Sequence, residues 1–325
     1  MKPAFSVLIF TVTSGAGYGL LLWMLFSQLG LYLSYGETVD LHELIGGGLL
    51  GLVLVTVGLL SSTLHLANPK NAWRAFNRFR TSWLSREGVF ALMFYPAFLT
   101  YVYLVWSQNG TITAAAMVAG LLAMIIAVLV NISTGMIYAS LKPIRQWHKP
   151  LTTPIYVLFS LMSGALIYLA LNAVTHGHIS YDLSHGYLIL AAITLITKWR
   201  YFASIGKPAG ATINTATSLG NEDKQAGKSQ AAVRLLDAGH SAETFLTNEF
   251  GYDAGAMKLM KLRKMMWLLA FVIPAITVVL GAHFQFNGAA FFAIAICFAG
   301  LLTERWLFFA EARHVVRLYH GDQET

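Results

Sequence analysis

Residues 112–141 read ITAAAMVAGLLAMIIAVLVNISTGMIYASL, an apolar run without a single charged side chain. A hydrocarbon core about 30 Å thick is crossed by roughly 20 helical residues, so this run predicts a membrane-spanning helix. Further runs of the same kind lie on both sides of it. Together with Ile112–Leu141, they give eight expected spans, the others being Phe5–Leu33, Leu44–Leu66, Val89–Trp106, Pro154–Val174, His185–Ala203, Met265–Phe284 and Gly288–Phe309.

The composition favours the same fold class. Of the 325 residues, 56% are hydrophobic and only 11% are charged, which is too little charge to cover the surface of a water-soluble domain. In lipid each span must satisfy its own backbone hydrogen bonds. Long unbroken runs therefore predict helices, and the short alternating segments of a membrane barrel are absent. We expect an all-α integral membrane protein with eight transmembrane helices.

Basic residues gather on one face of the membrane. The 22 Lys and Arg residues occur only at Lys2, between Lys70 and Arg86, between Lys142 and Lys149, from Lys198 through Lys264 and from Arg305 through Arg317. The alternate connections contain none: Ser34–Glu43, Ser107–Thr111, Thr175–Ser184 and Gln285–Asn287. Because basic loops stay in the cytoplasm, we expect a multi-pass protein of the inner (cytoplasmic) membrane with both termini cytoplasmic.

One long polar connection divides the chain. Residues 1–203 would form a six-helix part that contains the basic connection 67–87. Residues 204–264 form the polar loop, and residues 265–325 supply the last two helices and a cytoplasmic tail. A loop of this length without regular structure is usually either functional or disordered. Two interpretations stay open for it, a mobile linker and a docking surface for a soluble partner.

The connection between the second and third spans carries the strongest chemical signal. His65 lies at the cytoplasmic end of one apolar run and Glu87 at the entry to the next. Ionisable groups at membrane depth are costly, so they indicate a pathway or a site. An imidazole and a carboxylate could exchange the protons of a quinone, with Trp83 beside the ring. The alternatives are a histidine that caps a helix end and an interfacial ion pair between Arg86 and Glu87.

The same stretch resembles a known family. The runs His65–Pro69 and Arg74–Asn77, followed by Ser82, Leu84-Ser85 and Glu87, are similar to the membrane-anchor subunit of the dimethyl sulfoxide reductase family. The runs Arg80–Glu87, Gly135–Ala139 and Thr303–His314 look more like one branch, the anchor of cytoplasmic quinone-dependent sulfite dehydrogenases. The resemblance implies eight helices and electron exchange between quinone and an iron–sulfur subunit, which serves a molybdenum-cofactor subunit. It also implies that His65 and Glu87 belong to the quinone site.

Other candidates come from the residues themselves. Tyr138 and Arg305, with Trp83 and Arg86, are further candidate quinone-binding residues, and Glu304 joins Glu87 as a candidate proton relay. Each has a structural alternative: Tyr138 and Trp83 suit an interfacial belt, and Glu304 with Arg305 suits a salt bridge between helices. Within this chain we expect neither a catalytic centre nor a metal site.

Cofactor chemistry is limited by the single cysteine, Cys297, which cannot ligate an iron–sulfur cluster alone. Clusters and the molybdenum cofactor would therefore belong to partner subunits on the cytoplasmic face. Haem is not expected, because the histidines lie mainly at span ends or in loops. The quinone, ubiquinone or menaquinone, is not distinguished by the sequence.

The side of the membrane separates the competing functions. Dimethyl sulfoxide reductases hold their catalytic subunits on the periplasmic side, whereas the charges here place His65 and Glu87 at the cytoplasmic face. This difference favours an anchor that serves sulfite oxidation. The alternatives are a quinol-oxidising anchor of a dimethyl sulfoxide reductase-like enzyme, a haem-carrying quinone oxidoreductase subunit and a secondary transporter. The transporter is the least favoured, because the mid-span positions are nearly uncharged and no repeat is visible.

Overall fold

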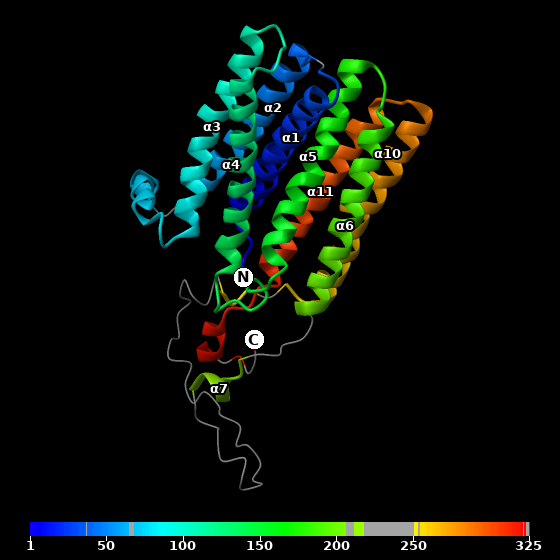
Figure 1. The fold of residues 1–325 in the computed structure, drawn as a ribbon. Coiled ribbons are helices and arrows are strands. Elements are labelled where there is room, and N and C mark those ends of the chain that lie inside the picture. Colours follow the sequence, from blue (N-terminus) through cyan, green and yellow to red (C-terminus); the bar gives the residue numbers. More distant parts are fainter. Residues whose placement is uncertain are drawn as a thin grey trace.

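The computed structural model describes residues 1–36, 38–64, 68–205, 211–217, 250–252, 254–320, 322 and 325. Over these residues the chain is helical, with one isolated β-bridge between Ile144 and His314. Eight helices in the described ranges are long and apolar enough to cross a membrane, as expected (Figure 1). They are α1 (Phe5–Tyr35), α2 (Leu41–Thr63), α3 (Trp83–Ser107), α4 (Ala114–Ala139), α5 (Thr152–His176), α6 (Tyr181–Ile205), a seventh span composed of α9 (Ala256–Trp267), η2 (Leu268–Val272) and α10 (Ile273–Phe284), and α11 (Gly288–Ala310).

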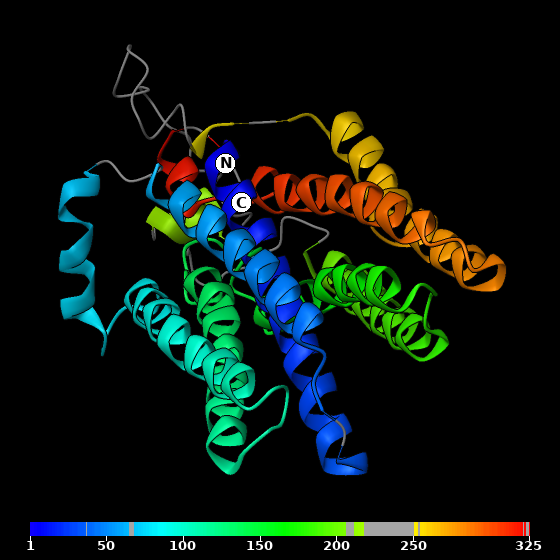
Figure 2. The same cartoon turned by 90° about the horizontal axis from the view of Figure 1, so that it is seen from above.

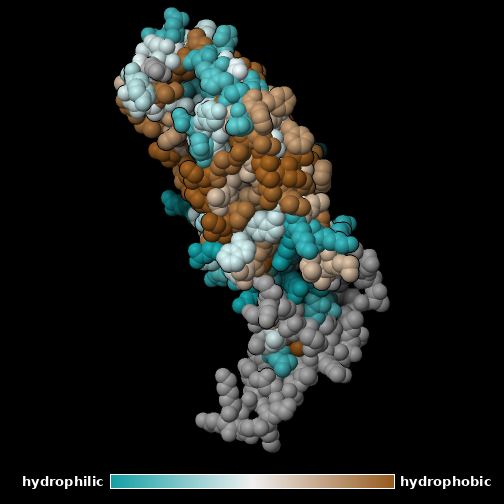
Figure 3. Space-filling model, turned by 90° about the vertical axis from the view of Figure 1, so that its right-hand side faces the viewer, coloured by the Kyte–Doolittle hydropathy of each residue, from teal (hydrophilic) through white to brown (hydrophobic). Residues whose placement is uncertain are grey.

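The outer surface of the bundle suits lipid. Large apolar side chains such as Leu49, Ile125 and Ile189 face outward and are 63%, 58% and 62% exposed. Figure 3 shows hydrophobic side chains in a band across the middle of one face, with hydrophilic side chains at both ends. A water-soluble protein rarely exposes an apolar area of this extent. The chain is a multi-pass membrane protein.

Several helices begin or end at other residues than the hydropathy indicates. Helix α3 begins at Trp83, ahead of the expected Val89, because the Ser82 side chain caps it by accepting a hydrogen bond from the Ser85 amide at 3.4 Å. Glu87 therefore lies inside the helix and not in a loop. The seventh span begins at Ala256, ahead of the expected Met265, because a basic turn continues the helix beyond the apolar run.

Helix α1 occupies the centre of the bundle. It packs against α2, α4, α5 and α11. Figure 2 shows α1 and α2 between the pair α3–α4 on one side and the helices α5, α6, α10 and α11 on the other. Two buried apolar clusters broadly follow this division. One consists mainly of residues of α1–α4, with Ile167 and Tyr168 of α5, and the other mainly of residues of α5, α6 and the last two spans, with Leu8, Val12 and Tyr138.

Small residues allow α1 and α5 to approach closely. Gly15 and Gly19 on α1 face Ser160 and Gly164 on α5, and the Ser160 hydroxyl donates to the Gly15 carbonyl at 2.6 Å. A Cβ atom at Gly19 would lie 1.9 Å from the Ser160 carbonyl oxygen. Pairs of small residues four apart allow this kind of contact in membrane helices, where the hydrophobic effect does not drive association.

A π-helical turn interrupts the seventh span. Pro274 lacks the amide proton that would bond to the Ala270 carbonyl in a regular α-helix. The turn Leu268–Val272 directly precedes it, and the thiol of Cys297 on α11 donates to the Ala270 oxygen at 3.8 Å. The lone cysteine thus satisfies a carbonyl that the proline leaves without its usual partner.

Both termini lie at one end of the bundle, which we call the basic end; it also carries the α2–α3 connection, the α4–α5 loop (Leu141–Leu151) and the tail after α11 (Figure 1). The N-terminal amine donates to the Ala312 carbonyl at 2.9 Å, and the Val315 amide donates to Pro143 at 3.1 Å. The indole of Trp147 donates to the Phe308 carbonyl at 2.9 Å. These bonds fix the α4–α5 loop and the tail against the ends of the helices.

Part of the long polar connection is described. Helix α7 (Ile213–Thr217) lies beside the C-terminal tail, where the Thr325 amide donates to the Ala211 carbonyl at 3.1 Å. Tyr319, in the tail helix η3 (Val315–His320), donates to the Ala216 carbonyl at 3.3 Å. Residues 206–210, 218–249 and 253 lie outside the described residues, so both interpretations of this connection stay open.

The glycine contact gives a test of the bundle. We expect Gly19→Leu and Gly164→Leu to lower the free energy of unfolding by roughly 3 kcal/mol or more, because backbone atoms cannot move aside for the new side chain. Gly30→Leu, also on α1, is the matched control, since nothing lies within 4 Å of a Cβ atom there. Thermal unfolding in mild detergent measures the difference. Equal stability of the Gly19 and Gly30 variants would contradict the packing described.

Candidate functional site

The structure brings together some of the candidate site residues at the basic end. Glu87, Tyr138, Glu304 and Arg305 are buried and come from α3, α4 and α11. Trp83 and Arg86 lie nearer the surface, at the start of α3. His65 lies outside the described residues, so its place in the site stays a prediction.

Glu87 is held between helices. Its side chain is buried in α3, and one carboxylate oxygen accepts a hydrogen bond from the hydroxyl of Thr134 on α4. The same hydroxyl also lies 3.0 Å from the Val130 carbonyl, four residues back on α4. A hydroxyl carries one proton, so it can donate to only one of these acceptors at a time. Thr134 can therefore serve Glu87 as a donor or, after rotation, as an acceptor.

Tyrosines connect the carboxylate to the neighbouring helices. Tyr18 on α1 and Tyr138 on α4 lie close enough to interact electrostatically with Glu87. The ring of Tyr138 stacks on Tyr156 of α5, with 5.4 Å between centroids, and meets the edge of Phe308 on α11 at the same distance. Polar groups of α1, α3, α4 and α5 thus meet in one buried region.

An ionic cluster lies on the far side of these tyrosines. The ammonium of Lys198 on α6 is 2.5 Å from Glu304 on α11, whose second oxygen pairs with the neighbouring Arg305. All three side chains are at most 5% exposed. The Arg305 guanidinium lies 4.1 Å from the centre of the Tyr156 ring, and Lys198 lies 4.3 Å from that of Tyr201. Ion pairs and aromatic faces together replace the water that these charges give up.

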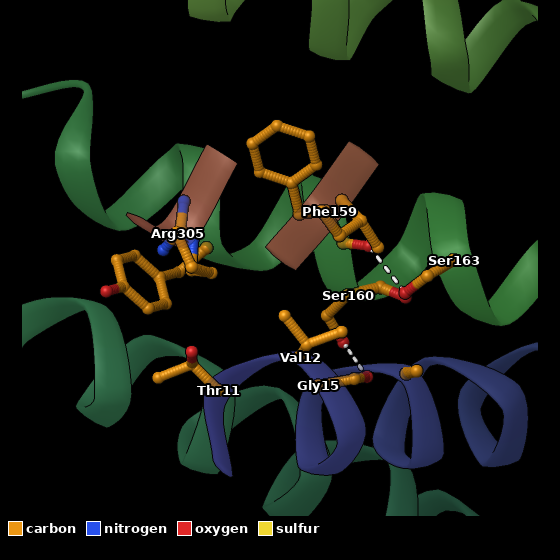
Figure 4. A pocket seen from close by; sticks show the side chains of 10 residues that line it. Thr11, Val12, Gly15, Phe159, Ser160, Ser163 and Arg305 are labelled. Carbon is orange, nitrogen blue, oxygen red and sulfur yellow. Dashed lines mark hydrogen bonds between the residues drawn. The ribbon is translucent and has the colours of Figure 1, made fainter. Parts of the chain in front are cut away.

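The cavity beside Arg305 is small. Figure 4 shows it between Thr11, Val12 and Gly15 of α1, Phe159, Ser160 and Ser163 of α5, and Arg305 of α11. Its volume is about 20 Å³, which accommodates one water molecule. Ligand pockets typically measure roughly 300 to 1,000 Å³, so a quinone ring does not fit here. The candidate roles of Glu304 and Arg305 at a quinone stay predictions.

Arg86 fixes the α2–α3 connection. Its guanidinium donates to the carbonyl oxygens of Phe79 at 3.0 Å and Arg80 at 2.7 Å, and lies 4.1 Å from the centre of the Trp83 ring. It makes no ion pair with Glu87 in the structure, so that alternative is wrong. Consecutive residues on a helix point about 100° apart, which directs Arg86 outward while Glu87 points inward.

Two buried charges were not expected from the sequence. Lys198 is counted above with the basic residues of the cytoplasmic face, but it lies inside α6 and is fully buried. Glu43 was placed in a loop at the opposite end, but it is buried in the first turn of α2, where the Tyr168 hydroxyl donates to it at 2.8 Å. Both charges lie toward the ends of their helices, Glu43 in the first turn of α2 and Lys198 in the last third of α6. The signal in the sequence was that Lys198 falls within the expected span His185–Ala203.

The described histidines do not form a metal site. No group of three or more His, Cys, Asp or Glu side chains in the described ranges could hold a metal ion. His176 and His178 are neighbours, with 6.3 Å between ring centroids, at the end of α5 opposite the basic end.

The ionic cluster predicts an order of stability. We expect Glu304→Gln to cost about 3–5 kcal/mol of unfolding free energy, because it leaves two adjacent buried cations without a counter-charge. Lys198→Met should cost less, because Glu304 and Arg305 remain as a neutral pair. Arg317→Gln, at the partly exposed pair with Asp322, should change stability by about 1 kcal/mol at most. Thermal unfolding in detergent gives the order, and a larger loss for Lys198→Met than for Glu304→Gln would contradict it.

Comparisons with known proteins place the chain in a family. The model of the family described as "DMSO reductase anchor subunit (DmsC)" matches residues 1–310. The chain is similar to a sulfite dehydrogenase subunit of Allochromatium vinosum, with 31% identity over 98% of this chain and 99% of that protein. No solved structure matches it. The chain therefore belongs to the DMSO reductase anchor subunit family.

Proposed function

We propose that this protein is the membrane anchor of a heterotrimeric molybdoenzyme and passes electrons between an iron–sulfur partner subunit and the quinone pool. The observation that carries the proposal is Glu87, a buried carboxylate held by Thr134 at the end of the bundle where both termini lie. Membership of the anchor family and the likeness to a sulfite dehydrogenase subunit over nearly its whole length support it. Sulfite oxidation in the cytoplasm is the proposed source of the electrons.

The residues around Glu87 suit the proton exchange that a quinone requires. Reduction of the ring takes two electrons and two protons. Glu87 can hold a proton or release it while keeping Thr134 as its partner, because the threonine hydroxyl can turn between Glu87 and the Val130 carbonyl. The proposed role of His65 is to bond a ring oxygen and supply the other proton.

The remaining candidates would position these groups. Trp83 and Arg86, which stack on each other, are proposed to border the entry from the lipid side. Tyr138 would form the inner wall of the site. Tyr138 stacks on Tyr156, and the Tyr156 ring contacts the Arg305 guanidinium. Through these contacts the ionic cluster would hold the Tyr138 side chain in one position. Glu304, held by two cations, is proposed to support the site and not to move protons itself.

Electrons must come from outside this chain. Its single cysteine, Cys297, is buried between α11 and the π turn. An iron–sulfur partner on the basic end would bring a cluster to the same end as Glu87, so that electrons and protons meet at the ring. The molybdenum cofactor would lie in the third subunit, where the substrate is oxidised.

Two substitutions test the proposed site. We expect Glu87→Gln and His65→Ala to lower quinone-linked turnover of the assembled complex at least about 100-fold, since general acid–base groups contribute roughly 10²–10⁴. Sulfite oxidation with an artificial acceptor should continue, because that reaction takes place in the partner. Glu43→Gln, the buried glutamate at the opposite end of the bundle, is the matched control and should retain turnover. Unchanged quinone-linked turnover in Glu87→Gln would reject the site.

Cysteine labelling tests the side of the membrane. Cys297 is buried, so a cysteine introduced at Asn77 or Gln108 can be labelled selectively. We expect a membrane-impermeant maleimide to label Gln108→Cys in intact cells, and Asn77→Cys only after the membrane is opened, because basic connections stay in the cytoplasm. The reverse pattern would place the partners outside the cytoplasm and favour the quinol-oxidising alternative.

A further inference from the structure

A short helix stands outside the bundle at the basic end. The 3₁₀-helix η1 (Pro69–Arg78) follows α2 and packs on α3. Both views place it on the outer flank beside the start of α3 and not beneath the bundle (Figures 1 and 2). This is the level at which the spanning helices end, where headgroups surround a membrane protein.

Aromatic residues define one side of η1. Side chains three apart in a 3₁₀-helix lie above one another, which aligns Trp73 with Phe76 and brings Phe79, the next residue in this series, to the same side. Phe76 packs on Gly88 of α3, where a Cβ atom would lie 3.1 Å from its ring, and Phe79 meets the edge of Phe90 at 5.7 Å. Trp73, further from α3, is 59% exposed. The aromatic side thus continues beyond the protein contact.

The rest of η1 and the following turn are basic. Lys70, Arg74, Arg78 and Arg80 are exposed, and the stretch from Pro69 to Arg86 contains no acidic residue. Arg74 lies over the Trp73 ring at 5.7 Å. Within the described ranges, no carboxylate forms a salt bridge with these four cations. The segment therefore presents exposed positive charge beside an exposed tryptophan.

We propose that η1 and the turn to Arg80 form a binding surface for anionic phospholipid headgroups. The surface joins an interfacial tryptophan to cations at headgroup level, the pattern by which amphipathic helices lie on membranes. Each basic residue near an anionic membrane surface strengthens binding by about fivefold. The lateral position decides against an acidic soluble protein as the occupant, because a partner beneath the bundle would meet the α4–α5 loop and the tail first.

Arg86 gives this surface a link to the interior. It bonds to the carbonyl oxygens of Phe79 and Arg80, and the next residue in α3 is Glu87. Headgroups that hold the connection in place would also hold the start of α3. The lipid surface itself does not depend on the quinone proposal, since it rests on residues 70–80 alone.

Native mass spectrometry of the full-length chain tests the proposal with phosphatidylglycerol and phosphatidylcholine as probes. We expect the wild-type chain to retain phosphatidylglycerol more tightly than phosphatidylcholine. The variant Arg74→Gln/Arg78→Gln/Arg80→Gln should lose about a hundredfold of its affinity for phosphatidylglycerol, while phosphatidylcholine binding stays unchanged. The triple Arg→Lys variant should restore affinity, because the charge is kept.

The matched control removes the same charge elsewhere on the basic end. Lys142→Gln/Arg145→Gln/Lys149→Gln in the α4–α5 loop should retain phosphatidylglycerol. Equal losses in the two glutamine variants would show an unspecific charge effect and overturn the proposal. Full phosphatidylglycerol affinity in the η1 glutamine variant, with loss of a co-purifying soluble subunit, would assign the surface to an acidic protein and also overturn it.

Discussion

A charge inside the hydrocarbon layer must be paired or neutralised, and this constraint shapes the basic end of the bundle. Glu304 forms ion pairs with Lys198 and Arg305, and each of these cations contacts the face of a tyrosine ring. Glu87 accepts a hydrogen bond from the Thr134 hydroxyl. Each pairing joins two helices or fixes a side chain against a neighbouring helix. The helices that carry these groups therefore cannot slide or rotate without separating a buried charge from its partner, which would cost several kcal/mol.

The central position of α1 makes these pairings possible. Helix α1 packs on α4, α5 and α11, the three helices whose Tyr138, Tyr156 and Arg305 contact one another. A wider spacing of α1 and α5 would enlarge the small cavity beside Arg305, because both helices line it. The packing of small residues in the middle of the bundle thus supports the rigidity of polar groups nearer its end.

Much of the fold could be predicted from the sequence because hydropathy and charge act locally. The run 112–141 contains a complete span, and the one-sided arrangement of Lys and Arg indicates which connections share a face. Glu87 lies inside α3 because the helix begins at the Ser82 cap. This cap is a local sequence signal, but a hydropathy profile does not detect it. The burial of Lys198 and Glu43 could not be derived in this way, because it depends on Glu304 and Tyr168, partners distant in sequence. The burial of Tyr138 could not be derived either, because it depends on contact with Tyr156 of another helix.

The depth of the candidate site follows from the solubility of its two proposed partners. A quinone stays in lipid, whereas a cluster-bearing subunit stays in water, so they can approach one another only near the plane where the helices end. Glu87 is buried one turn inside α3, close to that plane, and Arg86 beside it binds the α2–α3 connection through the Phe79 and Arg80 carbonyls. A carboxylate deeper in the bundle could not exchange protons with water. A carboxylate in the loop could not contact a quinone ring in the lipid. One turn of helix therefore satisfies both requirements, and this explains why the inward carboxylate and the outward guanidinium are consecutive residues.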